Sequence, residues 1–267
     1  MNDRVTVTIN EGVADVRMVR ADKMNALDDA MFGALIDAGT SLKTERGLRA
    51  VVLSGEGRAF CAGLDMGNFQ RSADTGGDPR PAGRLLPRTN GIANRPQYAA
   101  WVWREVPVPV IAAVHGVAFG GGFQVCLGAD MRYVAPDTKM SVMEIKWGLV
   151  PDMAGTVLMR HLMRDDVIRE LTYTGRIFTG EEAERMGLVT RLSANPREDA
   201  LATARDIAMK NPDAIRAAKR LMNASPLVSD AEGLMAESRE QDALGGKPNQ
   251  IEAVMAQLQK RAPRFVN

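Results

Sequence analysis

The sequence predicts an α/β fold that carries a helical C-terminal part. Strand and helix signals alternate up to about residue 145, and helical periodicity alone follows it. The chain has 267 residues, of which 45% are hydrophobic and 25% charged, so it can bury the core of one large domain. The predicted strands cover residues 5–9, 13–19, 50–54, 108–117, 131–135 and 140–145. The predicted helices cover residues 27–42, 120–127, 181–186, 198–209, 212–224, 230–244 and 249–260.

Charge and composition exclude several classes of partner. Lys and Arg number 34 and Asp and Glu 33, which gives a net charge of +1. A nucleic-acid or membrane-surface protein would show a basic excess, so we expect neither partner. The N-terminal residues lack the basic and apolar regions of a signal peptide, and the two cysteines suggest no disulfide framework. The simplest expectation is a cytoplasmic protein.

Several catalytic motifs are missing from the sequence. The two histidines, His115 and His161, have no metal-ligand spacing, so we expect no metal site. His115 is better explained as a hydrogen-bonded structural residue. The hydrolase motif GxSxG, the phosphate-binding motif GxxxxGK[ST] and the dinucleotide motif GxGxxG are all absent from the sequence.

Two glycine-containing turns each follow a predicted strand. The first covers residues 59–65, AFCAGLD, and the second covers residues 116–122, GVAFGGG. A strand-to-helix turn of small residues can leave backbone N–H groups unpaired and directed into a cleft. Two such donors that converge on one point form an oxyanion hole, which stabilises the enolate of a thioester. The alternative is tight packing of helix on sheet, but the pair of turns favours the catalytic interpretation.

These segments resemble the crotonase (enoyl-CoA hydratase/isomerase) superfamily in order and spacing. The resemblance includes RADKMNAL at residues 20–27, AFCAGLDM at 59–66 and GGG at 120–122. It continues through MEI at 143–145, GLVPD at 148–152 and QKRAPRF at 259–265, and so extends over nearly the whole chain.

The resemblance implies a crotonase-like spiral of ββα units with a helical C-terminal trimerisation region. Residues 1–195 would form the core with the active site, and residues 196–267 would serve oligomerisation as a homotrimer or hexamer. The substrate would be an acyl-CoA of fatty-acid metabolism, with coenzyme A as part of the substrate and no tightly bound cofactor. The N–H groups of Leu64 and Gly121 would form the oxyanion hole. The residues implied for coenzyme A binding are Lys23, Met24, Ala26, Ala62, Leu64, Asp65, Met66, Gly67 and Lys260, the last in its own or a neighbouring subunit.

The carboxylates bear on the type of reaction. Hydratases of the superfamily usually carry two glutamates, and here the two positions hold Gln124 and Glu144. An amide exchanges no proton at neutral pH, so Gln124 can only hydrogen-bond. Asp152 resembles an acidic residue of the dienoyl-CoA isomerase branch, although that branch usually has a carboxylate at position 124 as well. Helix N-capping is the competing explanation of Asp152.

Glu144 is expected on an apolar strand, where a charge needs a reason. An ion pair with Lys146, on the same strand face, competes with a catalytic role. Cys61 is interpreted as a small packing residue without a basic partner. Residues 71–87 and 94–104, the latter with Trp101 and Trp103, are expected to shape an apolar acyl pocket.

The sequence therefore favours an enoyl- or dienoyl-CoA double-bond isomerase in which Glu144 and Asp152 handle protons. The first alternative is a 2-enoyl-CoA hydratase with an atypical site, in which Glu144 acts with a water held by Gln124. The second alternative is a weakly active acyl-CoA binding protein.

Overall fold

The protein, represented by a computed structural model, is described over residues 3–65, 67 and 83–267. Within these residues it forms a six-stranded sheet, ordered β1-β2-β3-β4-β6-β9, and a three-stranded sheet, ordered β5-β7-β8. In the large sheet only the β1–β2 pair is antiparallel among the described pairs. The large sheet consists of β1 Val5–Asn10, β2 Val13–Met18, β3 Ala50–Gly55, β4 Val110–Val114, β6 Met131–Val134 and β9 Arg191–Leu192. The small sheet consists of β5 Val117–Phe119, β7 Lys139–Ser141 and β8 Phe178–Thr179.

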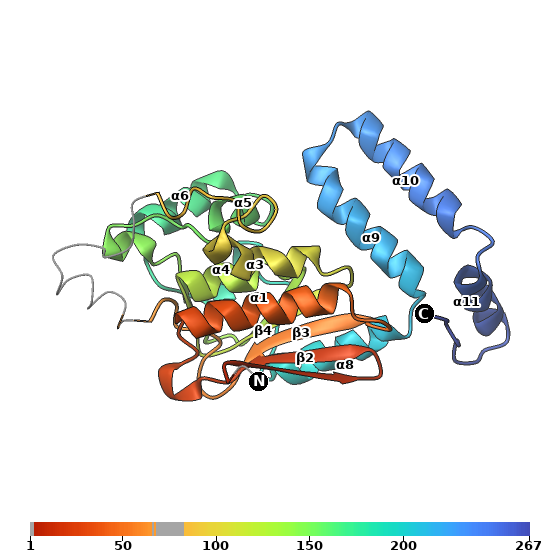
Figure 1. Cartoon of the computed structure of the whole chain (residues 1–267), viewed down its shortest axis with the longest axis horizontal. Helices are drawn as coiled ribbons and strands as arrows, with labels where there is room; N and C mark the ends of the chain where they lie inside the picture. The colour runs from red at the N-terminus through yellow and green to blue at the C-terminus, as the bar shows by residue number, and fades with distance from the viewer. Residues whose placement is uncertain (1–2, 66, 68–82) are drawn as a thin grey trace.

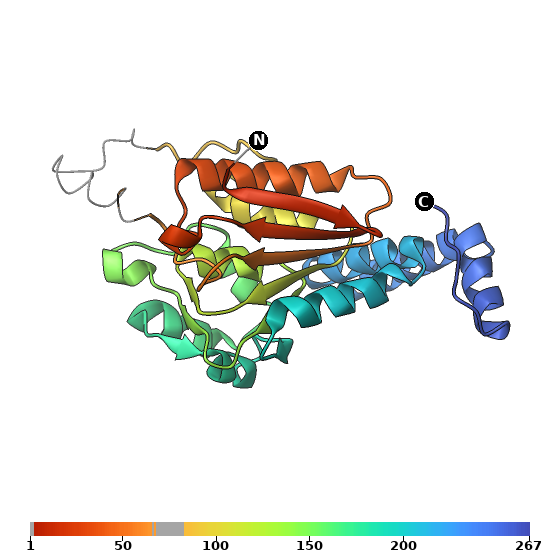
Figure 2. The ribbon, with the colours of Figure 1, turned by 90° about the horizontal axis from the view of Figure 1, so that it is seen from below.

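Helices cover both faces of the large sheet, which confirms the predicted α/β class (Figures 1 and 2). On one face α1 (Asp29–Lys43) packs against α3 (Arg95–Glu105), while α8 (Pro196–Ala208) lies across β2, β3, β4 and β6 on the other. Every residue of β3 and β4 is buried. Near-continuous apolar strands of this kind are typical of parallel sheets with helices on both faces.

Shorter helices lie between the strands of the core. A 3-10 helix, η1 (Ala21–Lys23), follows β2, and a second one, η2 (Glu144–Trp147), follows β7. The remaining helices of the core are α4 Gly121–Leu127, α5 Gly155–Met159, α6 Asp165–Thr174 and α7 Gly180–Arg185.

The strand predicted over residues 108–117 is two strands in two different sheets. It breaks at Gly116, whose φ of +64° lies in the left-handed region. A Cβ at this position would overlap the backbone carbonyl of Arg58, so glycine is required for the close approach. The break sends β4 into the large sheet and β5 into the small one.

The strand predicted over residues 140–145 ends early, at Ser141, and the chain then enters η2. Glu144 is therefore the first residue of a 3-10 helix and not a strand residue. The expectation that only helices follow residue 145 is also wrong. The two-residue strands β8 and β9 follow, and each adds to the edge of a sheet.

The last three helices project from the core as an arm (Figure 1). They are α9 Pro212–Ala224, α10 Asp230–Leu244 and α11 Pro248–Leu258, and a 3-10 turn, η3 (Ser225–Leu227), separates the first two. Lys219 of α9 anchors the arm, because its buried Nζ bonds Asp130 Oδ2 at 2.7 Å and the Val108 carbonyl at 2.9 Å. Among the described residues no helix is long and apolar enough to cross a membrane.

Candidate active site

The two predicted glycine turns lie side by side. Cys61 in the first turn and Ala118 in β5 form an isolated parallel β-bridge. Within it, the backbone N–H of Cys61 donates to the Val117 carbonyl at 3.1 Å, and that of Phe119 donates to the Cys61 carbonyl at 3.1 Å. The β-bridge therefore fixes the positions of the backbone N–H groups that follow in each turn.

Two unpaired N–H groups follow this bridge. Gly63 has a φ of +88°, and a Cβ built on it would lie 3.8 Å from the backbone nitrogen of Gly121. Among the described residues, neither the N–H of Leu64 nor that of Gly121 donates to a protein acceptor. Gly121 is the first residue of α4, where a helix leaves its N–H groups free. This arrangement is compatible with an oxyanion hole, while convergence on one point stays a prediction.

A third segment, residues 23–27, is tied to the first turn. Met24 and Asn25 both have left-handed backbones, with φ of 50° and 55°. The buried amide of Asn25 holds this conformation, because it donates to the carbonyls of Glu56 at 3.0 Å and Ala59 at 2.9 Å. The N–H of Ala62 in turn donates to the Met24 carbonyl at 2.9 Å.

Asp65 ends the first turn in a fixed position. Its Oδ1 accepts the N–H of Gly67, and its Oδ2 accepts from Arg20 at 2.6 Å. The Gly67 hydrogen bond lowers the pKa of Asp65, with a further contribution from Arg20, although burial opposes both. Asp65 is thus held as a carboxylate beside the cavity.

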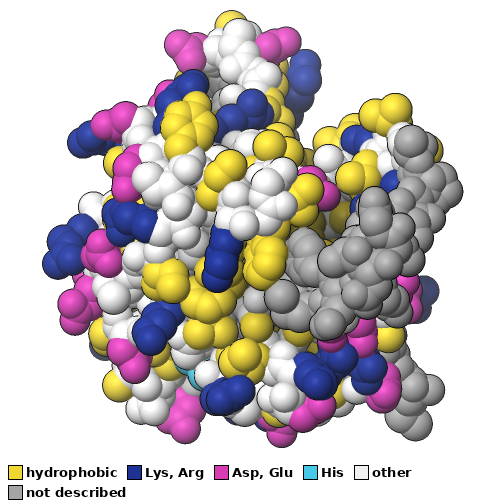
Figure 3. All heavy atoms as spheres, turned by 90° about the vertical axis from the view of Figure 1, so that its left-hand side faces the viewer, with side chains coloured by type: hydrophobic (Ala, Val, Ile, Leu, Met, Phe, Trp, Pro, Cys, Tyr) yellow, Lys and Arg dark blue, Asp and Glu magenta, His cyan; other side chains and the backbone are white. Residues whose placement is uncertain are grey.

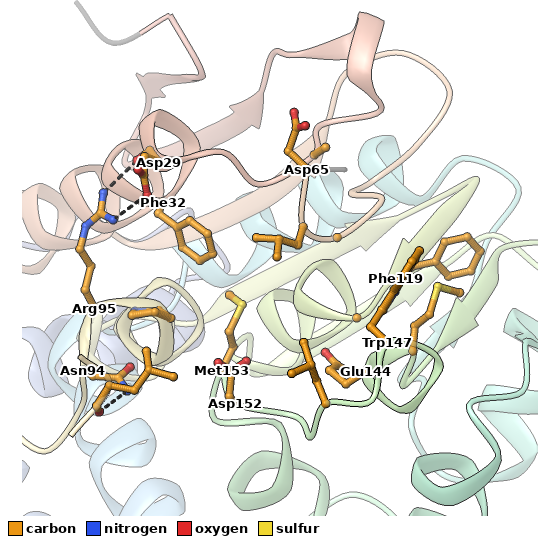
Figure 4. Close-up of a pocket in the computed structure, with 18 of the residues that line it drawn as sticks. Asp29, Phe32, Asp65, Asn94, Arg95, Phe119, Glu144, Trp147, Asp152 and Met153 are labelled. Carbon is orange, nitrogen blue, oxygen red and sulfur yellow. Dashed lines mark hydrogen bonds and ion pairs between the residues drawn. The ribbon is translucent and has the colours of Figure 1, made fainter. Parts of the chain in front are cut away.

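These segments surround a cavity of about 1430 Å³. Its wall contains most of the predicted site residues: Lys23, Met24, Ala26, Ala62, Leu64, Asp65, Gly67, Glu144 and Asp152. Phe32, Asn94, Arg95, Phe119, Trp147 and Met153 also line it (Figure 4). Figure 3 views this end of the molecule and shows apolar side chains in the middle of the face with charged side chains of both signs around them.

Some predicted residues do not line the cavity. Gly121 and Gln124 of α4 are buried and are not part of its wall, and Lys260 follows α11, at the opposite end of the molecule (Figure 1). Met66 and most of residues 71–87 lie outside the described residues. Of the predicted segment 94–104, Asn94 and Arg95 line the cavity. The prediction that Trp101 and Trp103 shape it is wrong, because Trp103 is fully buried and Trp101 lines a separate pocket.

Glu144 combines burial with one engaged oxygen. It is 9% exposed, and its Oε1 accepts a 2.5 Å hydrogen bond from Nε2 of Gln124. Its Oε2 is buried without a protein partner among the described residues. Burial raises the pKa of Glu144 and the Asp152 charge adds to the increase, while hydrogen bonds from its own backbone N–H and from Gln124 oppose it. A carboxyl with a raised pKa is suited to general acid–base catalysis.

The ion pair between Glu144 and Lys146, the competing explanation of Glu144, is not formed. The ammonium of Lys146 lies 5.5 Å from the centre of the Trp147 ring. A 3-10 helix turns about 120° per residue, so residues two apart do not share a face as they do on a strand. The competing structural explanation of Glu144 therefore fails.

Asp152 lies in the cavity wall on the same side as Glu144 (Figure 4). Helix N-capping, the competing explanation of Asp152, is not observed for α5, because the N-cap of that helix is Ala154, which has a left-handed backbone with φ of 66°. The negative charge of Asp152 raises the pKa of Glu144.

The sequence profile of the enoyl-CoA hydratase/isomerase family matches residues 8–267. The chain belongs to this family. Mouse enoyl-CoA hydratase domain-containing protein 2 is 30% identical over 264 residues, which cover 96% of this chain and 85% of the relative. A probable enoyl-CoA hydratase of Mycobacterium tuberculosis is 30% identical over 99% of this chain and 98% of its own length.

Solved structures show the family fold as well. A putative enoyl-CoA hydratase from Streptomyces coelicolor has a TM-score of 0.89 and 30% identity, covering 100% of this chain and 95% of the other. The enoyl-CoA hydratase of Bacillus anthracis has a TM-score of 0.87 and 26% identity, with 98% of both chains covered. The crotonase fold with C-terminal helices is thus confirmed, but the similarity gives no specific support to the dienoyl-CoA isomerase branch. The relatives are mitochondrial and bacterial proteins, so a cytoplasmic location stays a prediction.

Membership of the family makes this chain an enzyme of acyl-CoA chemistry that acts on coenzyme A thioesters.

The other titratable groups singled out in the sequence are structural. Cys61 and Cys126 are both fully buried, and burial raises the pKa of each thiol to about 12. A ring nitrogen of His115 bonds the Gly57 carbonyl at 2.8 Å, as expected of a structural histidine.

Sequence reasoning missed three residues that organise the site. Arg20 holds Asp65, Asn25 holds the left-handed segment, and Met153 packs against Gly121, where a Cβ would meet its sulfur at 2.8 Å. Arg20 and Asn25 lie within the family motif and could have been found from it. The packing of Met153 depends on a turn that no local pattern signals.

Proposed function

We propose that the protein isomerises a double bond in an enoyl- or dienoyl-CoA thioester through an enolate. One observation carries the proposal. Of the two positions that hold glutamates in hydratases, 124 and 144, only Glu144 is a carboxyl here, because position 124 holds the amide of Gln124. Glu144 lines the cavity and keeps one oxygen without a protein partner among the described residues.

The chemistry follows from this placement. The thioester oxygen accepts hydrogen bonds from the N–H groups of Leu64 and Gly121. Glu144 Oε2 removes a proton from C2 of a 3-enoyl thioester, and the electron pair spreads over the thioester oxygen and C4. The two N–H donors stabilise the oxyanion as it forms. Return of the proton from Glu144 to C4 gives the 2-enoyl product, so no atom is gained or lost.

Asp152 assists in this proposal by its charge. It lies in the same cavity wall and raises the pKa of Glu144. A higher pKa makes Glu144 a stronger base toward the weakly acidic C2 proton.

Hydration of a 2-enoyl thioester is the second candidate, because similar proteins carry hydratase names. It needs a water activated beside the substrate. Gln124 is fully buried, and its Oε1 already accepts two backbone N–H groups, so its amide is poorly placed to hold that water. This placement favours isomerisation.

A substrate screen tests the proposal. Purified protein and the Glu144→Gln variant are incubated with 2-enoyl, 3-enoyl and 3,5-dienoyl thioesters, and products are followed by ultraviolet absorbance and mass. Isomerisation leaves the mass unchanged, while hydration adds the mass of water. Hydration of the 2-enoyl thioester without conversion of the others would overturn the isomerase assignment. No turnover of any substrate would leave acyl-CoA binding as the remaining function.

The working enzyme is proposed to be a homotrimer or hexamer. Apolar side chains of the arm are exposed in the single chain, among them Met222, Leu234 and Leu258. Lys260 is placed in this proposal near the coenzyme A phosphates of a neighbouring subunit, since in its own chain it does not line the cavity.

A further inference from the structure

The amide of Gln124 has one possible orientation. Its Oε1 accepts the backbone N–H of Met153 at 2.8 Å and that of Gly155 at 2.9 Å. A flipped amide would direct its NH₂ group at two N–H donors, which is unfavourable. Nε2 therefore faces Glu144 as a donor, at 2.5 Å from Oε1. The side chain has no room to move away, because it is fully buried in α4.

This fixed donor divides the two oxygens of Glu144. Oε1 accepts the N–H of Gln124, so it cannot carry a proton on the side that faces Gln124. Oε2 is buried as well, but it has no protein partner among the described residues. We propose that Gln124 is a positioning residue that restricts proton transfer by Glu144 to Oε2 and so commits the site to reactions that begin with removal of a substrate proton. The inference rests on the proposed function and adds the device that selects the reaction.

The selection of the reaction depends on the turn that holds the Gln124 side chain. The two backbone N–H groups that this turn donates, from Met153 and Gly155, flank Ala154, whose backbone is left-handed. Successive N–H groups around a left-handed residue form a concavity that favours an anion. A glutamate at position 124 would be held there as a carboxylate, with its second oxygen against Oε1 of Glu144. Two carboxylates at that distance retain a shared proton. With Gln124 in place of a glutamate there is no shared proton, and Glu144 can begin the reaction as a base.

Few charged groups near Glu144 compete with the influence of Gln124 on its pKa. Among the described residues, Asp152 is the charged residue that acts on the pKa of Glu144, and α4 has no Asp, Glu, Lys or Arg. The charged residues of α6, which packs against η2, are exposed and form ion pairs: Asp165 with Arg169, Asp166 with Arg164, and Glu170 with Arg176.

The test measures the titration of Glu144 in the intact protein without substrate, by infrared spectroscopy of its carboxyl group. The Glu144→Gln protein identifies the band. Gln124→Glu keeps the size and the acceptor, and Gln124→Met removes the donor. We expect Gln124→Glu to keep a proton on the pair to a pH about one unit or more above the wild-type midpoint. We expect Gln124→Met to raise the Glu144 pKa as well, because the N–H donor to its carboxylate is lost.

Kinetics provide the second measurement. Gln124→Met is expected to lower kcat for isomerisation by about tenfold or more, with little change in KM, since a misplaced base loses rate and not binding. The pH–rate profile of Gln124→Met should move to higher pH by the same amount as the Glu144 titration midpoint measured by infrared spectroscopy. An unchanged Glu144 titration in Gln124→Glu overturns the inference, whether or not Gln124→Met folds.

A wild-type measurement needs no variant at position 124. The ¹⁵N signal of the Gln124 side-chain NH₂ should titrate with the Glu144 carboxyl and lose that transition in Glu144→Gln. Absence of the transition would contradict the inference. Because titration requires no turnover, it separates the inference from the proposed function, which fails only if no isomer forms.

Discussion

Gly63 and Phe119 approach so closely that a Cβ on Gly63 would lie 2.6 Å from the Phe119 carbonyl oxygen. Gly63→Ala should therefore push the two turns apart and separate the N–H groups of Leu64 and Gly121. Loss of one oxyanion donor costs about 10²- to 10³-fold in kcat, and we expect a loss of that order. Steady-state kinetics with the substrate found in the screen measure it.

Gly91→Ala provides the control. Gly91 also has a left-handed backbone, with φ of +59°, but a Cβ there meets nothing within 4 Å. It should therefore lower the melting temperature through backbone strain and leave kcat near the wild-type value. If the two variants lose the same activity, strain and not the separation of the N–H groups is responsible.

Replacement of Glu144 by Gln should abolish proton transfer while keeping the hydrogen bond from Gln124. We expect turnover to fall by about 10²-fold or more, the usual range for general acid–base catalysis. KM should change little, because the side chain keeps its shape. Near-full activity of Glu144→Gln on every substrate would remove Glu144 from the lead role.

The same variant should be more stable than the wild type at high pH. The pKa of Glu144 is raised in the folded state, mainly by burial. Because the pKa is higher in the folded than in the unfolded state, the protonated carboxyl contributes its full stability below the unfolded pKa. This contribution is lost as pH rises through the folded pKa. The melting temperature of Glu144→Gln should exceed that of the wild type by about 2 °C or more at pH 8, which is roughly 1 kcal/mol in a chain of this length. The difference should disappear near pH 4; a constant difference would contradict it.

Asp152→Asn should move the pH–rate profile toward acid. The charge of Asp152 raises the pKa of Glu144, so its removal lowers that pKa and brings the base form of Glu144 to lower pH. Asp22→Asn, which removes another charge from the cavity wall, should leave the profile in place. Profiles of kcat/KM between pH 5 and 9 decide the matter, and an unmoved profile in Asp152→Asn would exclude its assistance.

The assembly prediction can be tested on α10, which buries none of its residues in the single chain. Wild-type protein should have three or six times the chain mass by light scattering at micromolar concentration. Leu234→Lys should dissociate it, because Leu234 is 65% exposed in the single chain and would need to be covered. Ala243→Lys adds the same charge on the opposite face of the same helix, nine residues after Leu234, and should leave the mass unchanged. A monomeric wild-type protein would contradict the prediction.

Local patterns predicted most of the fold and failed where contacts distant in sequence decide. The helices α9 and α10 begin and end where capping and proline signals place them. Helix α3 was not predicted as a helix, although Asn94 and Gln97 form a capping box that signals its start. The two-residue strands β8 and β9 have no pattern long enough to detect, since they exist only because a sheet edge is available.

The site shows the same division. Leu64 and Glu144 were found from motif and chemistry, and both line the cavity. The geometry around Glu144 could not be predicted, because its 3-10 helix and its bond to Gln124 come from packing between α4, η2 and the turn at Ala154. The role of Gln124 is visible only once the two N–H groups that hold its oxygen are known.

The burial of the two cysteines has a consequence for the lifetime of the enzyme. A conjugated enoyl thioester is an electrophile, and a thiolate that meets it adds across the double bond and is alkylated. Cys61 stands next to Ala62 in the cavity wall, yet burial raises the pKa of both thiols to about 12. At pH 7 only about one thiol in 10⁵ is then a thiolate, the nucleophilic form. The fold thus protects the enzyme from inactivation by the reactive compounds that it handles.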